Sequence, residues 1–186
     1  DKLRSFNILR QLARTHRVWV SDCTDALERQ TIQRGAAIFL PPEVMGAHVS
    51  ASPNHQTQRT HSLAFRAITA LPFHFGIELD PLLLSGDEAT ELEAWIGHHK
   101  RLRGLFHGGT AFRLEDHDGR SIHGVVDPAG SRAAVVVAQL SLARRELPPP
   151  VRLPGLRFDA SYRVGVLNPN PPDFIRTTDA QAVLLA

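Results

Sequence analysis

The sequence has very little of the sulfur chemistry that cross-links chains or holds metals. One cysteine, Cys23, and one methionine occur in 186 residues. A single cysteine excludes an internal disulfide and every CxxC metal or redox motif. No apolar run approaches the roughly 18 residues of a membrane span, and nothing resembles a signal peptide. We therefore expect a soluble, cytoplasmic protein that has no membrane partner.

Net charge is also low, because 21 Lys and Arg face 19 Asp and Glu, for a formal charge of +2. The densest basic stretch, residues 98–103, lies in a helical pattern, which favours a solvated helix face over a nucleic-acid patch. We expect no nucleic-acid partner. The ten histidines match no HxxxH or HExxH spacing, so we expect no metal and no cofactor.

Three strand–loop–helix units are predicted in the first hundred or so residues. The strands are predicted at 17–20, 44–49 and 73–79, and the helices at 26–40, 62–71 and 88–106. The first helix carries Ile32, Ala36 and Phe39 at i, i+4, i+7 spacing, and Ser85 with Glu88 forms a capping box before the third. Alternating strands and helices indicate βα units and a parallel sheet, one side of a barrel.

The pattern changes after Gly109. Short apolar runs broken by turn signals, such as those at 118–119 and 127–130, predict an antiparallel β module. Further strands are predicted around 151–156 and 162–167. The expected domains are residues 1–109, the βα part, and 110–186, an antiparallel β domain that is either sandwich-like or an open sheet. Its last strands are expected to be missing.

The run VWVSDCTDALERQ places two aspartates three positions apart after a short apolar strand. Asp25 with Glu28 matches the cap signature of a helix start, which gives Asp25 a structural role. Asp22 precedes the cap and follows the strand directly, where βα folds concentrate functional groups. The residues alone leave two hypotheses for Asp22 equally open, a chemical role and a loop aspartate bonded to backbone.

A resemblance favours the chemical role. Three segments, VSDCTDALERQTIQRG, FLPPEVMGAHVSASPNHQTQRTHSLAFRA and FHFGIELD, resemble glycoside hydrolase family 36, the microbial α-galactosidases. The likeness runs from about Thr15 to about Gly109 and continues more loosely through the β module. It implies a retaining glycosidase whose fold is α/β followed by all-β. The three units would be the sixth to eighth of a (β/α)8 barrel, followed by a C-terminal antiparallel β domain.

The same resemblance implies site residues. The family's acid/base falls on Asp22, and Trp19 and His48 are expected to shape the pocket for a galactoside oligosaccharide such as raffinose or melibiose. The family's nucleophile lies in a KWD stretch and further sugar contacts in a CxSGGGR-like segment, and neither occurs here. Because the chain also opens without an initiator Met, we expect a fragment that is inactive alone, of an enzyme that is a homo-oligomer when whole. The alternative is a non-catalytic carbohydrate-binding or interaction module.

Several polar groups keep two interpretations. His48 is either a substrate contact or a buried, hydrogen-bonded histidine. The loop at 53–61 either lines the sugar pocket or, as we favour, is tied by its own side chains. Glu78 and Asp80 end the third predicted strand. One of them could pair with an arginine, but we favour a role as the cap of the turn that begins at Pro81. Cys23 is predicted to be a small packing or pocket-lining residue.

Overall fold

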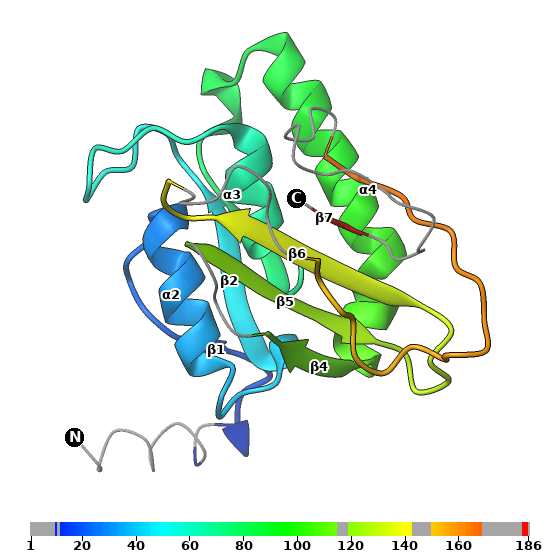
Figure 1. The fold of residues 1–186 in the computed structure, drawn as a ribbon. Coiled ribbons are helices and arrows are strands. Elements are labelled where there is room, and N and C mark those ends of the chain that lie inside the picture. Colours follow the sequence, from blue (N-terminus) through cyan, green and yellow to red (C-terminus); the bar gives the residue numbers. More distant parts are fainter. Residues whose placement is uncertain (1–9, 11, 115–118, 143–149, 169–183, 186) are drawn as a thin grey trace. The chain divides into compact units, whose positions relative to one another are not determined.

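The computed structural model describes residues 10, 12–114, 119–142, 150–168, 184 and 185 (Figure 1). The chain divides into two compact units, Asp1–His99 and Lys100–Ala186. The division falls within the long helix α4 (Gly86–Gly108). A domain boundary at residue 109 stays a prediction. The sequence also predicts a helix over residues 1–12, with Leu3, Phe6, Ile8 and Leu9 as its apolar residues, and this stretch lies largely outside the described residues.

The first unit is built on a parallel sheet with the order β1-β2-β3. The strands are β1 (Val18–Trp19), β2 (Met45–Ser50) and β3 (His74–Glu78). Helix α2 (Ala26–Ala36) follows β1, and helix α3 (Leu63–Ala70) follows β2. Single 3-10 turns lie at Pro42–Val44 and Pro81–Leu83. Both strand pairs are parallel, so the predicted βα arrangement is confirmed. The register sets Trp19 opposite Gly46 and His48 opposite Gly76.

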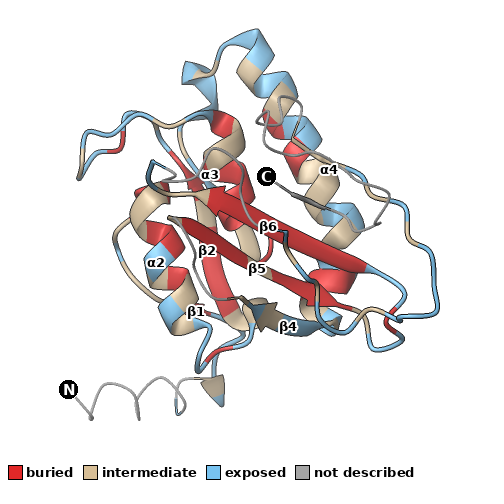
Figure 2. Cartoon of the chain, in the orientation of Figure 1, coloured by how far each residue is buried: buried red, intermediate tan, exposed pale blue. Residues whose placement is uncertain are grey.

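The middle strand separates two kinds of side chain. Met45, Ala47 and Val49 are fully buried, and α3 packs against β2 (Figure 2). Gly46 and His48 alternate with them, so they point to the opposite face of the sheet. One face of β2 is therefore apolar core, and the other is available for polar and aromatic groups.

Helix α2 buries a polar stripe, which corrects the apolar one predicted from Ile32, Ala36 and Phe39. Phe39 lies beyond the helix end and is 80% exposed. The buried residues of the helix are Ala26, Arg29, Gln30 and Gln33. The glutamines can be buried because α3 satisfies them: Gln30 donates to the Thr69 hydroxyl and Gln33 to its carbonyl, each at 2.8 Å.

Helix α3 is anchored at both its cap and its middle. The Ser62 hydroxyl accepts from the backbone N–H of Phe65 at 3.2 Å, as expected of an N-cap. Arg66 is buried and donates from Nη1 to the carbonyl of Ser50 at 2.6 Å, and its burial lowers its pKa. This bond ties α3 to the last residue of β2.

Helix α4 begins at the predicted capping box. The Ser85 backbone N–H donates to Glu88 at 3.0 Å, and the Glu88 N–H donates back to the Ser85 hydroxyl at 3.2 Å. Leu92 and Trp95 are buried in the first unit. The basic stretch that follows is mostly exposed, at Lys100, Arg101 and Arg103, as predicted for a solvated face.

The second unit contains a four-stranded sheet with the order β4-β5-β6-β7, formed by β4 (Thr110–Arg113), β5 (Arg120–Val126), β6 (Ala133–Gln139) and β7 (Leu184–Leu185). The first three strands are antiparallel, as predicted, and β7 pairs parallel to β6. The strands predicted at 151–156 and 162–167 are wrong: these segments run as turns and irregular chain, with one bridge residue, Val166. Val151 and Leu153 still pack on the buried cluster of Ile122, Val135 and Val137.

Candidate active site

Asp22 lies in the turn between β1 and α2, at the carboxyl end of the strand. Its residue is exposed, and no described residue donates a hydrogen bond to its carboxylate. In parallel α/β sheets, ligands bind at this edge. Asp22 is thus exposed at the sheet edge where proteins of this general architecture bind ligands.

The backbone around Asp22 is held firmly although its carboxylate is not. Gln56 bridges the turn, because its amide nitrogen donates to the Asp22 carbonyl at 3.2 Å and its amide oxygen accepts from the Thr24 N–H at 3.3 Å. Ser50 donates to the Thr24 carbonyl and Asn54 to the Thr24 hydroxyl, at 2.8 and 2.9 Å. The role of Gln56 was not predicted; the only signal was the polar composition of its loop.

Asp25 is the N-cap of α2, as predicted. It is fully buried, and one carboxylate oxygen accepts from the N–H groups of Leu27 at 2.8 Å and Glu28 at 3.2 Å. The other oxygen accepts from the Thr57 hydroxyl. Burial by itself would raise the pKa of Asp25, but these hydrogen bonds and the nearby His61 lower it below its ordinary value. Asp25 is therefore a buried, ionised structural group.

The loop after β2 is tied to this cap rather than open. Arg59 lies 3.6 Å from the Asp25 carboxylate and 2.6 Å from that of Glu28, and His61 lies 3.4 Å from Asp25. The hydrogen bond to Glu28 raises the pKa of Arg59. Asn54 accepts from the N–H groups of Gln56 and Thr57 within the loop. These contacts support the interpretation of a tied loop, with partners on both the loop and α2.

Trp19 and His48 come together on the sheet face opposite the apolar core. Their ring centroids are 4.4 Å apart with the planes tilted by 31°. Trp19 is 37% exposed and the His48 side chain 24%, so both rings contact their neighbours and still reach solvent. The structure thus brings together two of the three residues predicted for the site, on strands adjacent to the turn that carries Asp22.

Two glycines make room for this ring pair. A Cβ added to Gly46 would lie 3.1 Å from the Trp19 ring, and one added to Gly76 would lie 2.5 Å from His48 Cδ2. The rings therefore lie directly over the backbone of the neighbouring strand. Any side chain at Gly76 would displace the imidazole.

Glu78 and Asp80 divide the roles that the sequence left open. Glu78 pairs with His48, whose Nδ1 lies 3.1 Å from Oε2. Asp80 caps the turn at Pro81, where it accepts from the Leu82 N–H at 2.9 Å. The cap was predicted for this turn, whereas the partner of Glu78 is a histidine rather than an arginine.

Arg29 adds a cation behind the rings. Its guanidinium carbon lies 4.1 Å from the centroid of the Trp19 ring. Burial lowers the pKa of Arg29, and the nearby Cys23, Glu78 and Asp22 side chains partly offset this effect. Sequence patterns did not indicate this residue, which reads as an ordinary helix position.

Other kinds of site find no support in the described part of the chain. No group of three or more His, Cys, Asp or Glu side chains there could hold a metal ion. None of its helices combines the length and apolar character needed to cross a bilayer. Cys23 is a free, half-buried cysteine.

The comparison with known families decides the membership. A family model described as Melibiase matches residues 8–109, more than half of the chain. The chain belongs to the Melibiase family. An α-galactosidase from Escherichia coli is 44% identical over 158 residues, which cover 84% of this chain and 22% of the relative.

Solved structures of the same class match this Melibiase chain. The galactosidase domain of the α-galactosidase–sucrose kinase AgaSK has a TM-score of 0.78 and 39% identity, covering 82% of this chain and 22% of that one. A variant of the GH36 α-galactosidase AgaA from Geobacillus stearothermophilus, in complex with raffinose, has a TM-score of 0.74 and 35% identity, covering 79% and 21%. The resemblance to family 36 is confirmed. The Melibiase chain spans about a fifth of the length of these relatives.

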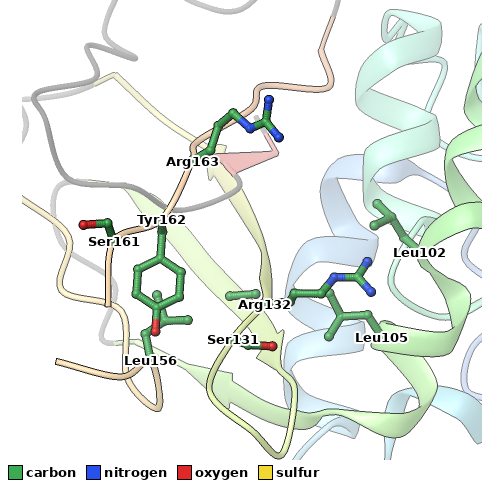
Figure 3. Close-up of a pocket in the computed structure, with 9 residues that line it drawn as sticks. Leu102, Leu105, Ser131, Arg132, Leu156, Ser161, Tyr162 and Arg163 are labelled. Carbon is green, nitrogen blue, oxygen red and sulfur yellow. The ribbon is translucent and has the colours of Figure 1, made fainter. Parts of the chain in front are cut away.

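The second unit of the Melibiase chain contains a cavity of about 200 Å³ that takes no residue from the candidate site. Figure 3 shows the Tyr162 ring beside Leu156, with Arg132 reaching toward Leu105. The Tyr162 hydroxyl is already engaged, because it donates to the Gly130 carbonyl at 2.5 Å and accepts from the Arg157 N–H at 2.6 Å. The ring therefore serves as a fixed wall.

Proposed function

We propose that this chain forms the acid/base side of an α-galactosidase active centre, with Asp22 as the general acid/base. The observation that carries the proposal is the placement of Asp22: an exposed residue at the carboxyl end of β1, on a backbone held by Gln56 and three positions after Trp19, whose ring contacts His48. Membership of the Melibiase family supports it. The three βα units would be the last three of a (β/α)8 barrel, and the second unit the start of a sandwich-like β domain.

In the proposed mechanism Asp22 donates a proton to the oxygen of the departing group and then removes a proton from water. A retaining glycosidase needs a second carboxylate about 5–5.5 Å away as the nucleophile. The KWD stretch that bears it in the family does not occur in this sequence. Asp25 cannot substitute, because it is fully buried and committed to capping α2. We propose that the chain alone does not hydrolyse galactosides.

Trp19 and His48 would bind the sugar. A pyranose ring has one apolar face of C–H groups, which suits the indole, and hydroxyls that suit the imidazole nitrogen not engaged by Glu78. Solved AgaA variants hold raffinose and stachyose, so terminal α-galactosides of this kind are the proposed substrates. A homo-oligomeric whole enzyme and a cytoplasmic location stay predictions.

Two assays on the purified chain test the proposal. Raffinose should protect Trp19 from acrylamide quenching, with sucrose, which lacks the galactosyl group, as the control sugar; Trp95 is buried and contributes little quenching. Galactose release from raffinose should be undetectable. Hydrolysis by the chain alone would contradict the missing nucleophile, and equal protection by sucrose would contradict a galactoside site.

The same quenching assay separates the alternative function. If the chain were a non-catalytic binding module, it would bind raffinose, but replacing Asp22 in the whole protein would not change turnover. Loss of turnover in the whole galactosidase on Asp22→Asn, with raffinose affinity retained, would support the enzyme. Unchanged turnover would support the binding module.

A further inference from the structure

Four side chains form one continuous row of contacts across the first unit. Arg29 from α2 covers the Trp19 ring at 4.1 Å, the Trp19 ring contacts the His48 ring at 4.4 Å, and His48 Nδ1 reaches Glu78 at 3.1 Å. The order is cation, indole, imidazole and carboxylate, drawn from α2, β1, β2 and β3 in turn. Only the two middle members were expected to touch sugar.

Arg29 is the most unusual member. It is 2% exposed, and neither Nη1 nor Nη2 has a hydrogen-bond partner among the described residues. Burying a guanidinium without hydrogen bonds is unfavourable, so a compensating interaction is expected. Its defined contact is the face of Trp19, and a desolvated cation over an indole is the strongest arrangement of this kind.

Arg29 cannot act by touching a substrate, because both terminal nitrogens are inaccessible to solvent. Its effect must pass through the ring that it covers. The guanidinium fixes one face of the indole and leaves the exposed part of the ring for a ligand.

Glu78 holds the His48 ring, at the opposite end of this row from Arg29. A carboxylate beside Nδ1 favours the imidazole tautomer that carries the proton there, and it fixes the ring plane over Gly76. The Glu78 side chain is 45% exposed, so it is not needed for core packing. Its contact with His48 is the interaction that the structure assigns to it.

We propose that Arg29 and Glu78 are positioning residues that hold the Trp19–His48 ring pair from its two ends and thereby set the affinity for a galactoside. The ligand class is a neutral pyranoside with an apolar face. This assignment rests on the proposed function for its sugar, but the ring positions can be tested without sugar.

The first experiment measures the Trp19 environment in variants of Arg29. Arg29→Met keeps length and removes charge, Arg29→Lys keeps charge, and Arg66→Met removes another buried arginine that bonds to Ser50 instead of a ring. Arg29→Met should increase acrylamide quenching and weaken raffinose binding by about three- to tenfold. Arg29→Lys should restore most of both, and Arg66→Met should change neither beyond its effect on stability.

The second experiment uses Glu78, where variants are expected to fold because the site is half exposed. Glu78→Ala should shift the His48 ring ¹⁵N signals from the Nδ1–H pattern toward the Nε2–H pattern and weaken raffinose binding about threefold. Glu78→Gln, whose amide oxygen still accepts from Nδ1, should recover both.

The outcomes separate the two claims. Unchanged quenching in Arg29→Met together with an unchanged His48 tautomer in Glu78→Ala would overturn the positioning roles, whatever the sugar affinity. If the unaltered chain binds no raffinose, the proposed function fails, while the quenching and tautomer results still decide whether Arg29 and Glu78 position the rings.

Discussion

Replacing Asp25 by alanine should destabilise the chain strongly, whereas replacing Asp22 should not. The two aspartates are three positions apart and differ in burial and hydrogen bonding. Asp25 is fully buried with three hydrogen bonds to its carboxylate, and Asp22 is exposed with none from the described residues. The pair therefore provides a matched comparison within one turn.

The magnitude for Asp25→Ala follows from its contacts. Loss of an N-cap costs about 0.5–2 kcal/mol. Loss of the acceptor for the Thr57 hydroxyl adds about 1–2 kcal/mol, because the donor is left partly buried without a partner. We expect a decrease in unfolding free energy of about 2–4 kcal/mol for Asp25→Ala, and of less than about 0.5 kcal/mol for Asp22→Ala, as is usual for exposed sites.

The variant Asp25→Asn separates the stability contributed by the helix cap from that contributed by the negative charge. An asparagine caps nearly as well as an aspartate, but it loses the attraction to Arg59 and His61. Its destabilisation should fall between the other two variants. Urea unfolding followed by far-UV circular dichroism, with the slope m constant across the set, measures all three. Equal stabilities of Asp22→Ala and Asp25→Ala would refute the division of roles between the two carboxylates.

Two further predictions concern pH and the ring pair. The pKa of Asp25 is lower in the folded chain than its ordinary value, so its contribution to stability is present above about pH 4 and is lost as pH falls through the lowered pKa. Thermal melts should therefore show that the melting temperature falls more steeply with acid for the unaltered chain than for Asp25→Asn. Parallel curves for the two proteins would contradict this prediction. Gly76→Ala should displace His48 and weaken raffinose binding at least threefold, because the new Cβ would lie 2.5 Å from the imidazole. The control is Gly35→Ala on α2, where the new Cβ meets nothing within 4 Å beyond the backbone of its own helix. An equal effect of both variants would refute the close approach at Gly76.

Local signals account for the parts of this structure that the sequence predicted. The strand–helix alternation, the cap at Asp25 and the capping box at Ser85 depend on residues within a few positions of one another. The wrong strand prediction at 151–156 has a local cause as well. Pro154 cannot donate to a sheet and Gly155 adopts a positive φ of 77°, so Val151 and Leu153 pack on the core without strand partners.

Long-range partners account for what the sequence did not predict. Gln30 and Thr69 meet across 39 positions, so the polar buried face of α2 could not be inferred from its own periodicity. Glu78 and His48 are 30 positions apart, and Gln56 reaches Asp22 across 34. Each of these contacts depends on the register and spacing of the parallel strands, which set the side chains of separate βα units against one another.

The most direct test of the central claim is the leaving-group dependence of Asp22→Ala in a whole α-galactosidase that carries this sequence. If Asp22 protonates the departing oxygen, kcat/KM for raffinose should fall by about 10²- to 10⁴-fold. That for 2,4-dinitrophenyl α-galactoside, whose leaving group departs without a proton, should fall much less. A uniform loss on both substrates, or no loss on raffinose, would contradict the assignment of Asp22 as the acid/base.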